Sequence, residues 1–410
     1  MIKSEQALAI VLDSIRIKGT EKINVLSSLH RILAQDIYAT CDVPAFAKSA
    51  VDGYALRSTD VKNASEKSPV ILEVVDDVAA GYVSKKKLKE GQAIRIMTGA
   101  PIPQGADSVV MVEFTQRFKT QRGEFVKVFK DTEYKENIRA KAEDVRKGEK
   151  VLAKGTLIRP QEMGMLASLG ISSIRVAKKP KVGILTTGDE LVRIDRPLTK
   201  GKIRDSNAYC LTGQVLSVGA TPVSLGIAQD NPEEVRRKII AAINKDIDLL
   251  LVSGGVSVGD YDLVKDVLAE LGTKINFWKV AIRPGKPLVF GRIKGIPVFG
   301  LPGNPVSSMI VFDEFVRPTI LKMLGAKELF RPVATAIFKQ SFKKKQGLKY
   351  FVRVKIENKN NQLYASLTGP QGSGILKSMV LADAIMVIPE EVSELKRGDR
   401  VCVQLLTDRF

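Results

Sequence analysis

The central part of the chain alternates short apolar runs with longer amphipathic stretches. The apolar runs have strand length and lie at Val182–Thr186, Pro222–Leu225, Asp248–Val252, Phe277–Ile282, Pro287–Gly291 and Pro297–Phe299. Hydrophobic residues recur at helical spacing near 206–218, over 232–244 and 261–271, and from Pro305 to about Leu324. This alternation predicts an α/β domain with a mainly parallel sheet over residues 180–327.

The flanking regions have a different pattern. Residues 45–139 contain short β-rich runs separated by glycine and proline, which predict a small inserted β-rich domain. Helices are predicted over 4–18 and 160–169, with Pro160 in a first turn, where its missing N–H costs nothing. We therefore expect residues 1–44 and 140–179 to form an N-terminal mixed α/β domain, and the strands of 328–410 to form a C-terminal β domain.

Cysteine and histidine are too scarce for several kinds of site. Cys41, Cys210 and Cys402 form no CxxC pair, so their spacing excludes a zinc finger or a dithiol redox motif. His30 is the single histidine, and its neighbours do not resemble a nucleophile elbow. Chemistry is therefore expected to depend on carboxylates, lysines, arginines and backbone amides.

The sequence also limits where the protein is expected to work. The N-terminal segment carries acidic residues and lacks the apolar core of a secretory signal. No apolar run approaches the roughly 18 residues that a membrane span needs. We expect a cytoplasmic protein with no membrane partner.

The chain is strongly basic, with 64 Lys and Arg against 45 Asp and Glu and a net charge of +19. Such an excess is typical of nucleic-acid binding, and it would also favour a small anionic substrate. However, the bases are spread along the whole chain, and no aromatic residues are interleaved with the lysines of the runs Lys85–Lys87 and Lys343–Lys345. We interpret both runs as solvated surface and expect no nucleic-acid partner.

Three glycine-containing loops follow predicted strands of the α/β domain. They contain Gly188 and Asp189; Ser253, Gly254, Gly255, Ser257 and Gly259; and Pro302, Asn304 and Ser307. Open α/β sheets bind ligands at the carboxyl ends of their strands, and glycine lets the backbone approach an anion closely. One such loop is weak evidence, but three at one sheet edge predict a binding site.

Charged residues lie close to these loops in the sequence. Lys279 and Arg283 are four apart in a predicted strand and so are expected on one face, with Lys286 across a Pro-Gly turn. Three grouped cations suit a multiply charged anion such as phosphate or an oxyanion. The acids are Asp189, Glu190, Asp230, Asp260 and Asp262. A Mg²⁺ ion between phosphate and carboxylate would reconcile both signs, although Asp230 and Asp262 could equally cap helices.

Segments along nearly the whole chain carry a further signal. They are SAVDGYA at 49–55, TGAPIP at 98–103, Glu143-Asp144, TTGDEL at 186–191, IRDSN at 203–207, SGGVSVGD at 253–260, RPGKP at 283–287, LPGNPVS at 301–307 and GPQGSG at 369–374. Together they resemble the signature segments of the bacterial molybdopterin molybdenumtransferases, the MoeA family, to which the C-terminal domain of gephyrin is related.

The resemblance implies an α/β plus β fold in an elongated multidomain protein. It implies a central MogA-like three-layer α/β domain, the inserted β-rich domain and a C-terminal β-barrel-like domain, with the N-terminal domain serving dimerisation in a homodimer. The implied activity is insertion of molybdenum from molybdate, a substrate, into adenylylated molybdopterin, with release of AMP. A molybdopterin adenylyltransferase is considered as a further partner.

Roles for individual residues follow from the same resemblance. The 253–260 loop, Glu190, Asp230 and Asp262 would hold the adenylylated substrate and Mg²⁺, while Lys279, Arg283 and Lys286 would hold pterin phosphate or molybdate. Asp52, Thr98 and Asp144 would face the cleft from the partner subunit, and Ser373 would lie near it from the C-terminal domain. The catalytic set expected in this way is Asp52, Asp144, Glu190, Asp262, Lys279 and Arg283.

Some of these assignments keep alternatives. Spacing alone favours simple turns at Asp52-Gly53 and at 98–101. Arg283 stands where the family pattern has lysine more often, so the geometry of its contact is open. The alternative functions are a molybdopterin adenylyltransferase or related nucleotide-handling enzyme, and a non-catalytic, gephyrin-like scaffold.

Overall fold

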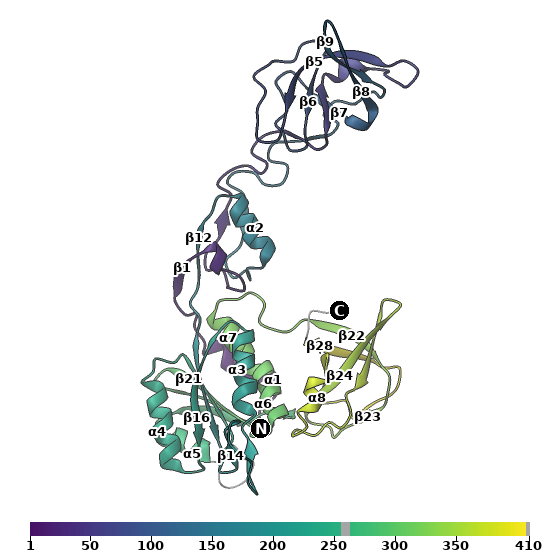
Figure 1. Cartoon of the computed structure of the whole chain (residues 1–410). Coiled ribbons are helices and arrows are strands. Elements are labelled where there is room, and N and C mark those ends of the chain that lie inside the picture. The colour runs from purple at the N-terminus through teal and green to yellow at the C-terminus, as the bar shows by residue number, and fades with distance from the viewer. Residues whose placement is uncertain (256–262, 407–410) are drawn as a thin grey trace.

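The computed structural model describes residues 1–255 and 263–406 and shows an elongated molecule built from several domains (Figure 1). The α/β domain and the C-terminal β domain lie side by side at one end. The inserted β-rich domain lies at the other end, and a small mixed domain joins the two (Figure 1). The predicted fold class is confirmed.

The α/β domain is built on a six-stranded sheet of order β16-β13-β17-β21-β20-β18. Its strands are β13 Lys181–Thr187, β16 Thr221–Ala228, β17 Leu249–Ser253, β18 Lys274–Lys279, β20 Pro287–Ile293 and β21 Ile296–Leu301. Strands β16, β13, β17 and β21 run parallel, β20 pairs antiparallel with β21, and β18 pairs antiparallel with β20. The mainly parallel sheet is therefore as predicted.

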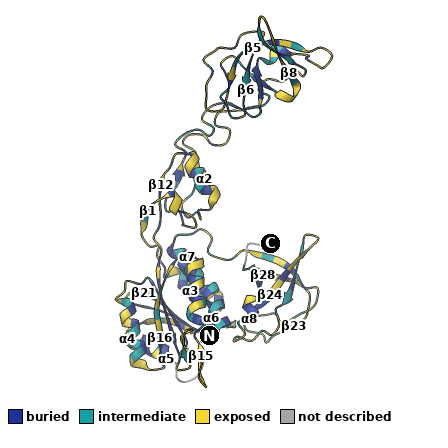
Figure 2. Ribbon diagram, viewed as in Figure 1, coloured by how far each residue is buried: buried dark blue, intermediate teal, exposed yellow. Residues whose placement is uncertain are grey.

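Helices cover both faces of this sheet, giving three layers. They are α3 Asn207–Ser217, α4 Pro232–Ile243, α5 Leu263–Glu270, α6 Pro305–Val311 and α7 Arg317–Met323. Alternate strand residues face opposite layers, so Leu249 and Leu251 pack with α3, α6 and α7, while Leu250 and Val252 pack with α4 and α5. The helices turn their buried sides to the sheet and their exposed sides outward (Figure 2).

The segment between α6 and α7 is a π-helical turn, Phe312–Val316, inside what the periodicity predicts as one helix. It carries Asp313 and Glu314, which face the chain leaving the α/β domain: Arg331 Nη2 lies 3.0 Å from Asp313 Oδ1. An adjacent pair of acids thus lies where the α/β domain meets the C-terminal domain.

The first helix differs from the prediction in length and position. α1 spans Ser4–Asp13 instead of 4–18, and its Ala7 and Val11 belong to the core of the α/β domain together with residues of α7. The boundary prediction placed residues 1–44 with 140–179. Periodicity gave the helix its apolar face but could not say which domain would cover it.

The small mixed domain combines segments from before and after the insertion. It contains β1 Thr20–Asn24, β2 Ile37–Tyr38, β11 Lys150–Leu152, α2 Pro160–Ser168 and β12 Ser173–Ala177. β1 pairs with β12 and β2 with β11, over a core that includes Leu33, Ile158 and Leu166.

The inserted domain has a six-stranded sheet of order β7-β4-β6-β5-β9-β8. The strands are β4 Gly53–Leu56, β5 Val70–Val78, β6 Gln92–Ile96, β7 Ser108–Met111, β8 Thr115–Thr120 and β9 Gly123–Val128. The short pair β3 Lys48–Ser49 and β10 Ile138–Arg139 lies where the chain enters and leaves this domain.

The C-terminal domain is a closed barrel, because β24 pairs with both β25 and β26 in the ring β24-β25-β22-β28-β26. Its strands are β22 Val333–Phe338, β24 Lys349–Lys359, β25 Gln362–Leu367, β26 Ala384–Ile388 and β28 Arg400–Leu405, with the short pair β23 Phe342–Lys343 and β27 Glu394–Leu395 and the helix α8 Lys377–Val380. No helix within the described residues has the length and apolar character to cross a membrane.

Candidate active site

The glycine-containing loops end neighbouring strands and line one cavity of about 1290 Å³. Gly188, Gly254, Gly255 and Gly303 all contribute to its wall. Among the described residues, its charged lining is mostly acidic and consists of Glu190, Asp205, Asp230, Asp266 and Glu270, with Arg204 as the one cation. We call this cavity the acidic pocket. The predicted gathering of the loops at one sheet edge is seen in the described parts of the three loops; Ser257, Gly259, Asp260 and Asp262 lie outside the described residues.

Only glycine fits at position 254, because both the backbone conformation and the neighbouring backbone exclude a side chain. Its φ of +97° is in the left-handed region, and a Cβ there would lie 2.2 Å from the carbonyl oxygen of Thr187. Its amide donates to the carbonyl of Leu301, 3.1 Å away. The end of β17 is therefore packed directly between the ends of β13 and β21.

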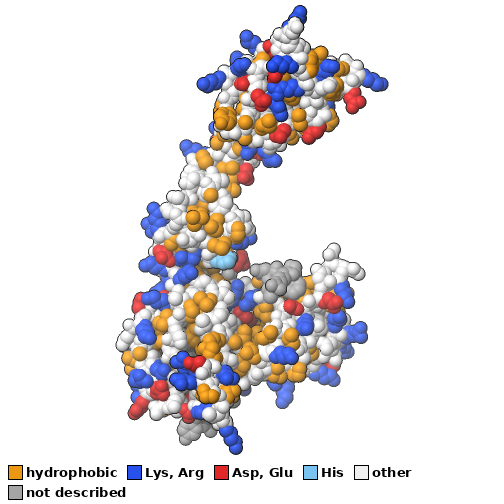
Figure 3. Space-filling view, viewed as in Figure 1, with side chains coloured by type: hydrophobic (Ala, Val, Ile, Leu, Met, Phe, Trp, Pro, Cys, Tyr) orange, Lys and Arg blue, Asp and Glu red, His pale blue; other side chains and the backbone are white. Residues whose placement is uncertain are grey.

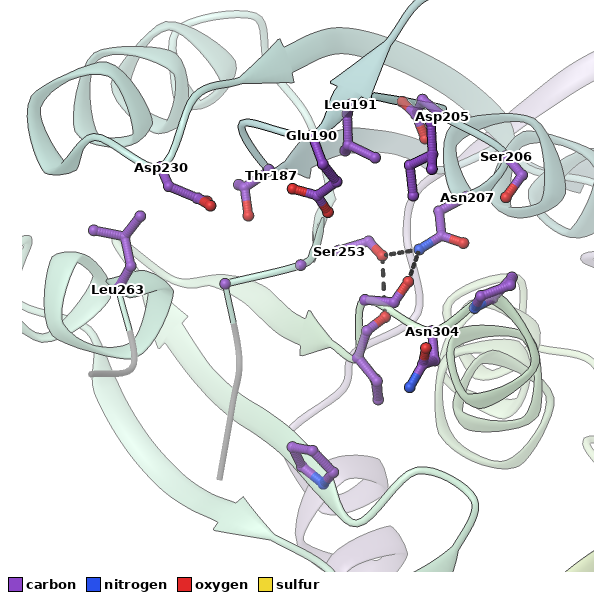
Figure 4. A pocket seen from close by; sticks show the side chains of 18 of the residues that line it. Thr187, Glu190, Leu191, Asp205, Ser206, Asn207, Asp230, Ser253, Leu263 and Asn304 are labelled. Atoms are coloured by element: carbon purple, nitrogen blue, oxygen red, sulfur yellow. Dashed lines mark hydrogen bonds between the residues drawn. The ribbon is translucent and has the colours of Figure 1, made fainter. Parts of the chain in front are cut away.

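Two acids of the predicted metal site face the same space. Figure 4 shows the carboxylates of Glu190 and Asp230 turned toward each other near Thr187. Asp230 does not cap α4: the side chain of Asn231 accepts from the amides of Glu233 and Glu234. This removes the capping explanation that the sequence had left open for Asp230.

Asp189 has a different environment. It does not line the acidic pocket, and its Oδ1 accepts the backbone N–H of Asp230 at 3.1 Å. It thereby ties the loop after β13 to the loop after β16. The substrate contact of Asp189 stays a prediction.

The IRDSN segment, to which the sequence assigned no role, lies beside Ser253 and Asn304 of the loops (Figure 4). The Nδ2 of Asn207 donates to Ser253 Oγ at 2.9 Å and to the carbonyl of Gly303 at 2.8 Å. Asp205 accepts from Thr186 Oγ1 at 2.6 Å and from the amide of Ala208 at 3.0 Å. The start of α3 is thus hydrogen-bonded to the ends of β13, β17 and β21.

A second cavity, of about 900 Å³, lies between the α/β domain and the C-terminal barrel. Its charged lining residues are all cations: Arg283, Lys286, Lys343, Lys344, Lys345 and Arg353. We call it the basic pocket. Asn304, Ser307 and Ser373 also line it, and the carbonyl of Ser373 accepts the amide of Val306 at the start of α6. Pro287, Pro302 and Asn304 line both pockets, so the two cavities adjoin.

The predicted arrangement of the three cations needs correction. Lys279 ends β18 in the α/β sheet, whereas Arg283 belongs to the short strand β19, Ile282–Arg283, which pairs with β24 of the barrel. The two are not on one strand or one face, because the chain leaves the sheet between them. Arg283 and Lys286 line the basic pocket; Lys279 lines neither cavity, although it pairs with Pro287, which lines both.

The interpretation of Lys343–Lys345 as solvated surface was also incomplete. All three line the basic pocket, and Lys344 Nζ lies 5.1 Å from the ring centroid of Tyr350. Arg283 lies 5.5 Å from the same ring. Tyr350 lies outside the lysine run in the sequence, and the fold of the barrel brings its ring against Lys344. Elsewhere, lysines and arginines are dispersed over every domain on the face that Figure 3 shows.

Arg353 is the residue that the sequence reasoning missed. It is 1% exposed, donates Nε to Ser378 Oγ and Nη2 to the carbonyl of Gly372, and forms no ion pair with a described carboxylate. Burial lowers its pKa to about 10, which still leaves it charged at neutral pH. A buried cation without an acid is costly unless an anion binds beside it. The sequence did contain a signal for this residue, because Arg353 interrupts the largely apolar run 350–356.

The remaining predicted residues lie elsewhere in the chain. Asp52 Oδ1 accepts from the hydroxyl and the amide of Thr98 at 2.6 and 2.7 Å, and these hydrogen bonds lower the pKa of Asp52. Both belong to the inserted domain, far from the acidic pocket (Figure 1). Asp144 lines a small third cavity with Lys48, Arg139 and Glu143. Within one chain these residues do not meet the glycine loops.

The comparisons with known proteins agree with this domain arrangement. Three family models match successive parts of the chain: the MoeA N-terminal region (domain I and II) at residues 2–170, a probable molybdopterin binding domain at 183–322 and the MoeA C-terminal region (domain IV) at 335–406. The fold and the two pockets therefore belong to a protein of the MoeA type.

Whole-length relatives define the family more closely. The molybdopterin molybdenumtransferase of Bacillus subtilis (strain 168) is 38% identical over 389 residues, which cover 95% of this chain and 90% of that protein. That of Haemophilus influenzae is 36% identical over 407 residues, 98% of each chain. The crystal structure of a molybdopterin biosynthesis MoeA protein from Pyrococcus horikoshii OT3 matches with a TM-score of 0.85 at 34% identity, covering 99% of this chain and 100% of that one. The chain belongs to the MoeA family of transferases, which supports a role in molybdenum cofactor biosynthesis.

Proposed function

We propose that this protein inserts molybdenum from molybdate into adenylylated molybdopterin and releases AMP. The observation that carries the proposal is the adjacency of the two pockets, which share Pro287, Pro302 and Asn304. An acidic pocket lined by glycine turns suits a nucleotide phosphate with its metal ion, and an all-cationic pocket beside it suits an oxyanion. A reaction between a nucleotide-bound substrate in one pocket and an oxyanion in the other requires that the two pockets adjoin.

The acidic pocket is proposed to hold the adenylylated end of the substrate. Close backbone approach at Gly254 and Gly255 admits phosphate oxygens, and the carboxylates of Glu190 and Asp230 are hard oxygen ligands suited to Mg²⁺. Among the described residues, no three acids or other ligands cluster tightly enough to form a metal site by themselves. Glu190 and Asp230 are proposed to hold Mg²⁺ together with substrate phosphates, with Asp262 as a further ligand. When bound, the ion would neutralise phosphate charge.

The basic pocket is proposed to hold molybdate. Arg353 would contact the dianion from a buried position, and Arg283 and Lys286 from the pocket wall, while Ser307 and Ser373 supply hydroxyl groups. Two molybdenum–sulfur bonds form as the dithiol loses two protons, and one oxo group leaves as water. Attack of water on the phosphoanhydride then releases AMP. No protein nucleophile is required.

Asp52, Thr98 and Asp144 are proposed to reach this site from the partner subunit of a homodimer. The support is that they lie in a part of the molecule that does not meet the acidic pocket of its own chain (Figure 1). A molybdopterin adenylyltransferase remains the partner expected to supply the substrate, and the cytoplasm the expected location.

The test is an AMP-release assay with purified protein, adenylylated molybdopterin and Mg²⁺, with and without molybdate. We expect release only when molybdate is present. Release without molybdate would contradict the coupling, and no release in either case would contradict the activity. A reaction that starts from ATP and unmodified molybdopterin would instead indicate the adenylyltransferase alternative.

A charge-removal pair tests the placement of molybdate. Arg283→Gln should weaken molybdate binding by about 1–3 kcal/mol, because it removes a charged donor from the pocket wall. Lys279→Gln removes the same charge from the edge of the site and should have the smaller effect. Calorimetric titration with molybdate measures both, and a larger effect at Lys279 would place the oxyanion elsewhere.

A further inference from the structure

The two glycine turns that divide the pockets are in direct contact with each other. Ser253 pairs with Leu301 across β17 and β21, and the turns 253–255 and 302–304 follow these residues. A Cβ on Gly303 would lie 3.7 Å from the Cα of Gly254. The first turn lines the acidic pocket, whereas Pro302 and Asn304 of the second line both. The second turn therefore forms part of the wall between the two pockets, and the first turn lies against it.

One side-chain amide bonds to both turns. Asn207 is 9% exposed, and its Nδ2 uses both of its hydrogens, one for the 2.9 Å bond to Ser253 Oγ and one for the 2.8 Å bond to the carbonyl of Gly303. Ser253 Oγ in turn donates to the carbonyl of Pro302 at 3.2 Å. All of these residues line the acidic pocket, and Figure 4 shows the bonds as dashed lines between Asn207, Ser253 and the second turn.

The position of Asn207 is itself fixed. It is the first residue of α3, and the preceding Asp205 is bonded to Thr186 at the end of β13 and to the amide of Ala208 in the first turn of the helix. The start of α3 is thus hydrogen-bonded to the ends of β13 and β17 and to the turn that follows β21. The Oδ1 of Asn207 is buried and has no hydrogen-bond partner among the described residues, so the bonds of this amide to the two turns are made by its donors.

We propose that Asn207 is a positioning residue that fixes the two glycine turns relative to each other, and thereby aligns the ligand in the acidic pocket with the anion in the basic pocket. The effect on the reaction rests on the proposed function, whereas the hydrogen bonds of Asn207 to the two turns do not depend on it. Asn207 lines the acidic pocket but is not one of its charged residues, and each pocket keeps its charged residues when Asn207 changes, so each ligand should still bind. Alignment of the two is what should fail, and misplacement of reacting groups by about 1 Å costs up to about a hundredfold in rate.

The chain offers a matched control on the same helix. Gln214 is also an amide of α3, its Nε2 donates to the carbonyl of Met309 at 3.1 Å, and its Oε1 is buried without a partner in the part of the chain that the structure describes. It lines none of the cavities described above. Asn207→Asp and Gln214→Glu are both isosteric, and each replaces a buried donor with an acceptor, so both should destabilise the fold through the same kind of loss.

The experiment compares these two variants with wild type in two measurements. In the AMP-release assay, Asn207→Asp should lower kcat at least about tenfold while KM for each substrate changes less than about threefold, and Gln214→Glu should leave both near wild type. In amide hydrogen exchange, the peptides carrying Gly254 and Gly303 should exchange at least about tenfold faster in Asn207→Asp only.

The outcomes separate this proposal from the proposed function. Equal loss of kcat in the two variants, or unchanged exchange at both turns in Asn207→Asp, would overturn the positioning role. Faster exchange with an unchanged kcat would overturn it too. If wild type releases no AMP, the proposed function fails, and the exchange comparison alone decides whether Asn207 holds the turns.

Discussion

Glu314 provides a pH-dependent test of how the α/β domain meets the barrel. Its carboxyl lies in the π-helical turn beside Asp313 and faces Arg331 of the linker, Lys349 of β24 and Gln404 of β28. Burial raises its pKa from 4.5 to about 7. The hydrogen bond with Gln404 and the charges of Lys349 and Arg331 lower the pKa but do not outweigh burial.

The direction of the pH effect follows from this shift. Because the folded protein binds the Glu314 proton more tightly than the unfolded chain, the group contributes stability that is fully present below about pH 4.5 and is lost as the pH rises through about 7. A shift of this size corresponds to about 3 kcal/mol. Glu314→Gln keeps the shape and removes the ionisation, so it should abolish this loss.

The measurement is urea unfolding at about pH 5 and about pH 8.5, followed by the fluorescence of Trp278, the one tryptophan, which lies in β18 of the same domain. The free energy of unfolding of Glu314→Gln, taken relative to that of wild type, should increase by about 2–3 kcal/mol from about pH 5 to about pH 8.5. Glu357→Gln is the control, since hydrogen bonds from Lys359 and Lys339 lower the pKa of that exposed glutamate below this range. An advantage of Glu314→Gln that does not change with pH would refute the reasoning.

Three further predictions concern the pockets. Gly254→Ala should lower AMP affinity at least about tenfold by calorimetric titration, because its Cβ collides with a backbone carbonyl; Gly272→Ala, also at positive φ but with nothing within 4 Å, should lose stability without losing affinity. Tyr350→Leu should weaken molybdate binding by about 1 kcal/mol through loss of the ring beside Arg283, whereas Tyr350→Phe should be nearly neutral; equal effects would point to the 3.4 Å hydroxyl contact instead. Arg353→Met should lower molybdate affinity at least about tenfold without lowering the urea midpoint, since no described carboxylate loses its partner; a large stability loss would indicate a structural role.

Local pattern was sufficient to predict the elements that surround the site. Apolar runs and helical spacing predicted β13, β17 and β21 and the helices after them, because burial on both faces of a parallel sheet leaves continuous apolar runs. The gathering of glycine turns at one sheet edge followed from the same reasoning, since parallel strands bring their carboxyl ends together.

The sequence did not determine which surfaces of the α/β domain and the C-terminal barrel would contact each other. Lys279 and Arg283 are four residues apart, yet one belongs to the α/β sheet and the other to the barrel, because the backbone leaves one sheet and pairs with another within that interval. Arg353 and Lys343–Lys345 became pocket residues only when the barrel packed beside the α/β domain. Such contacts depend on how whole domains bury their remaining surface, and periodicity within a single element carries no information about that.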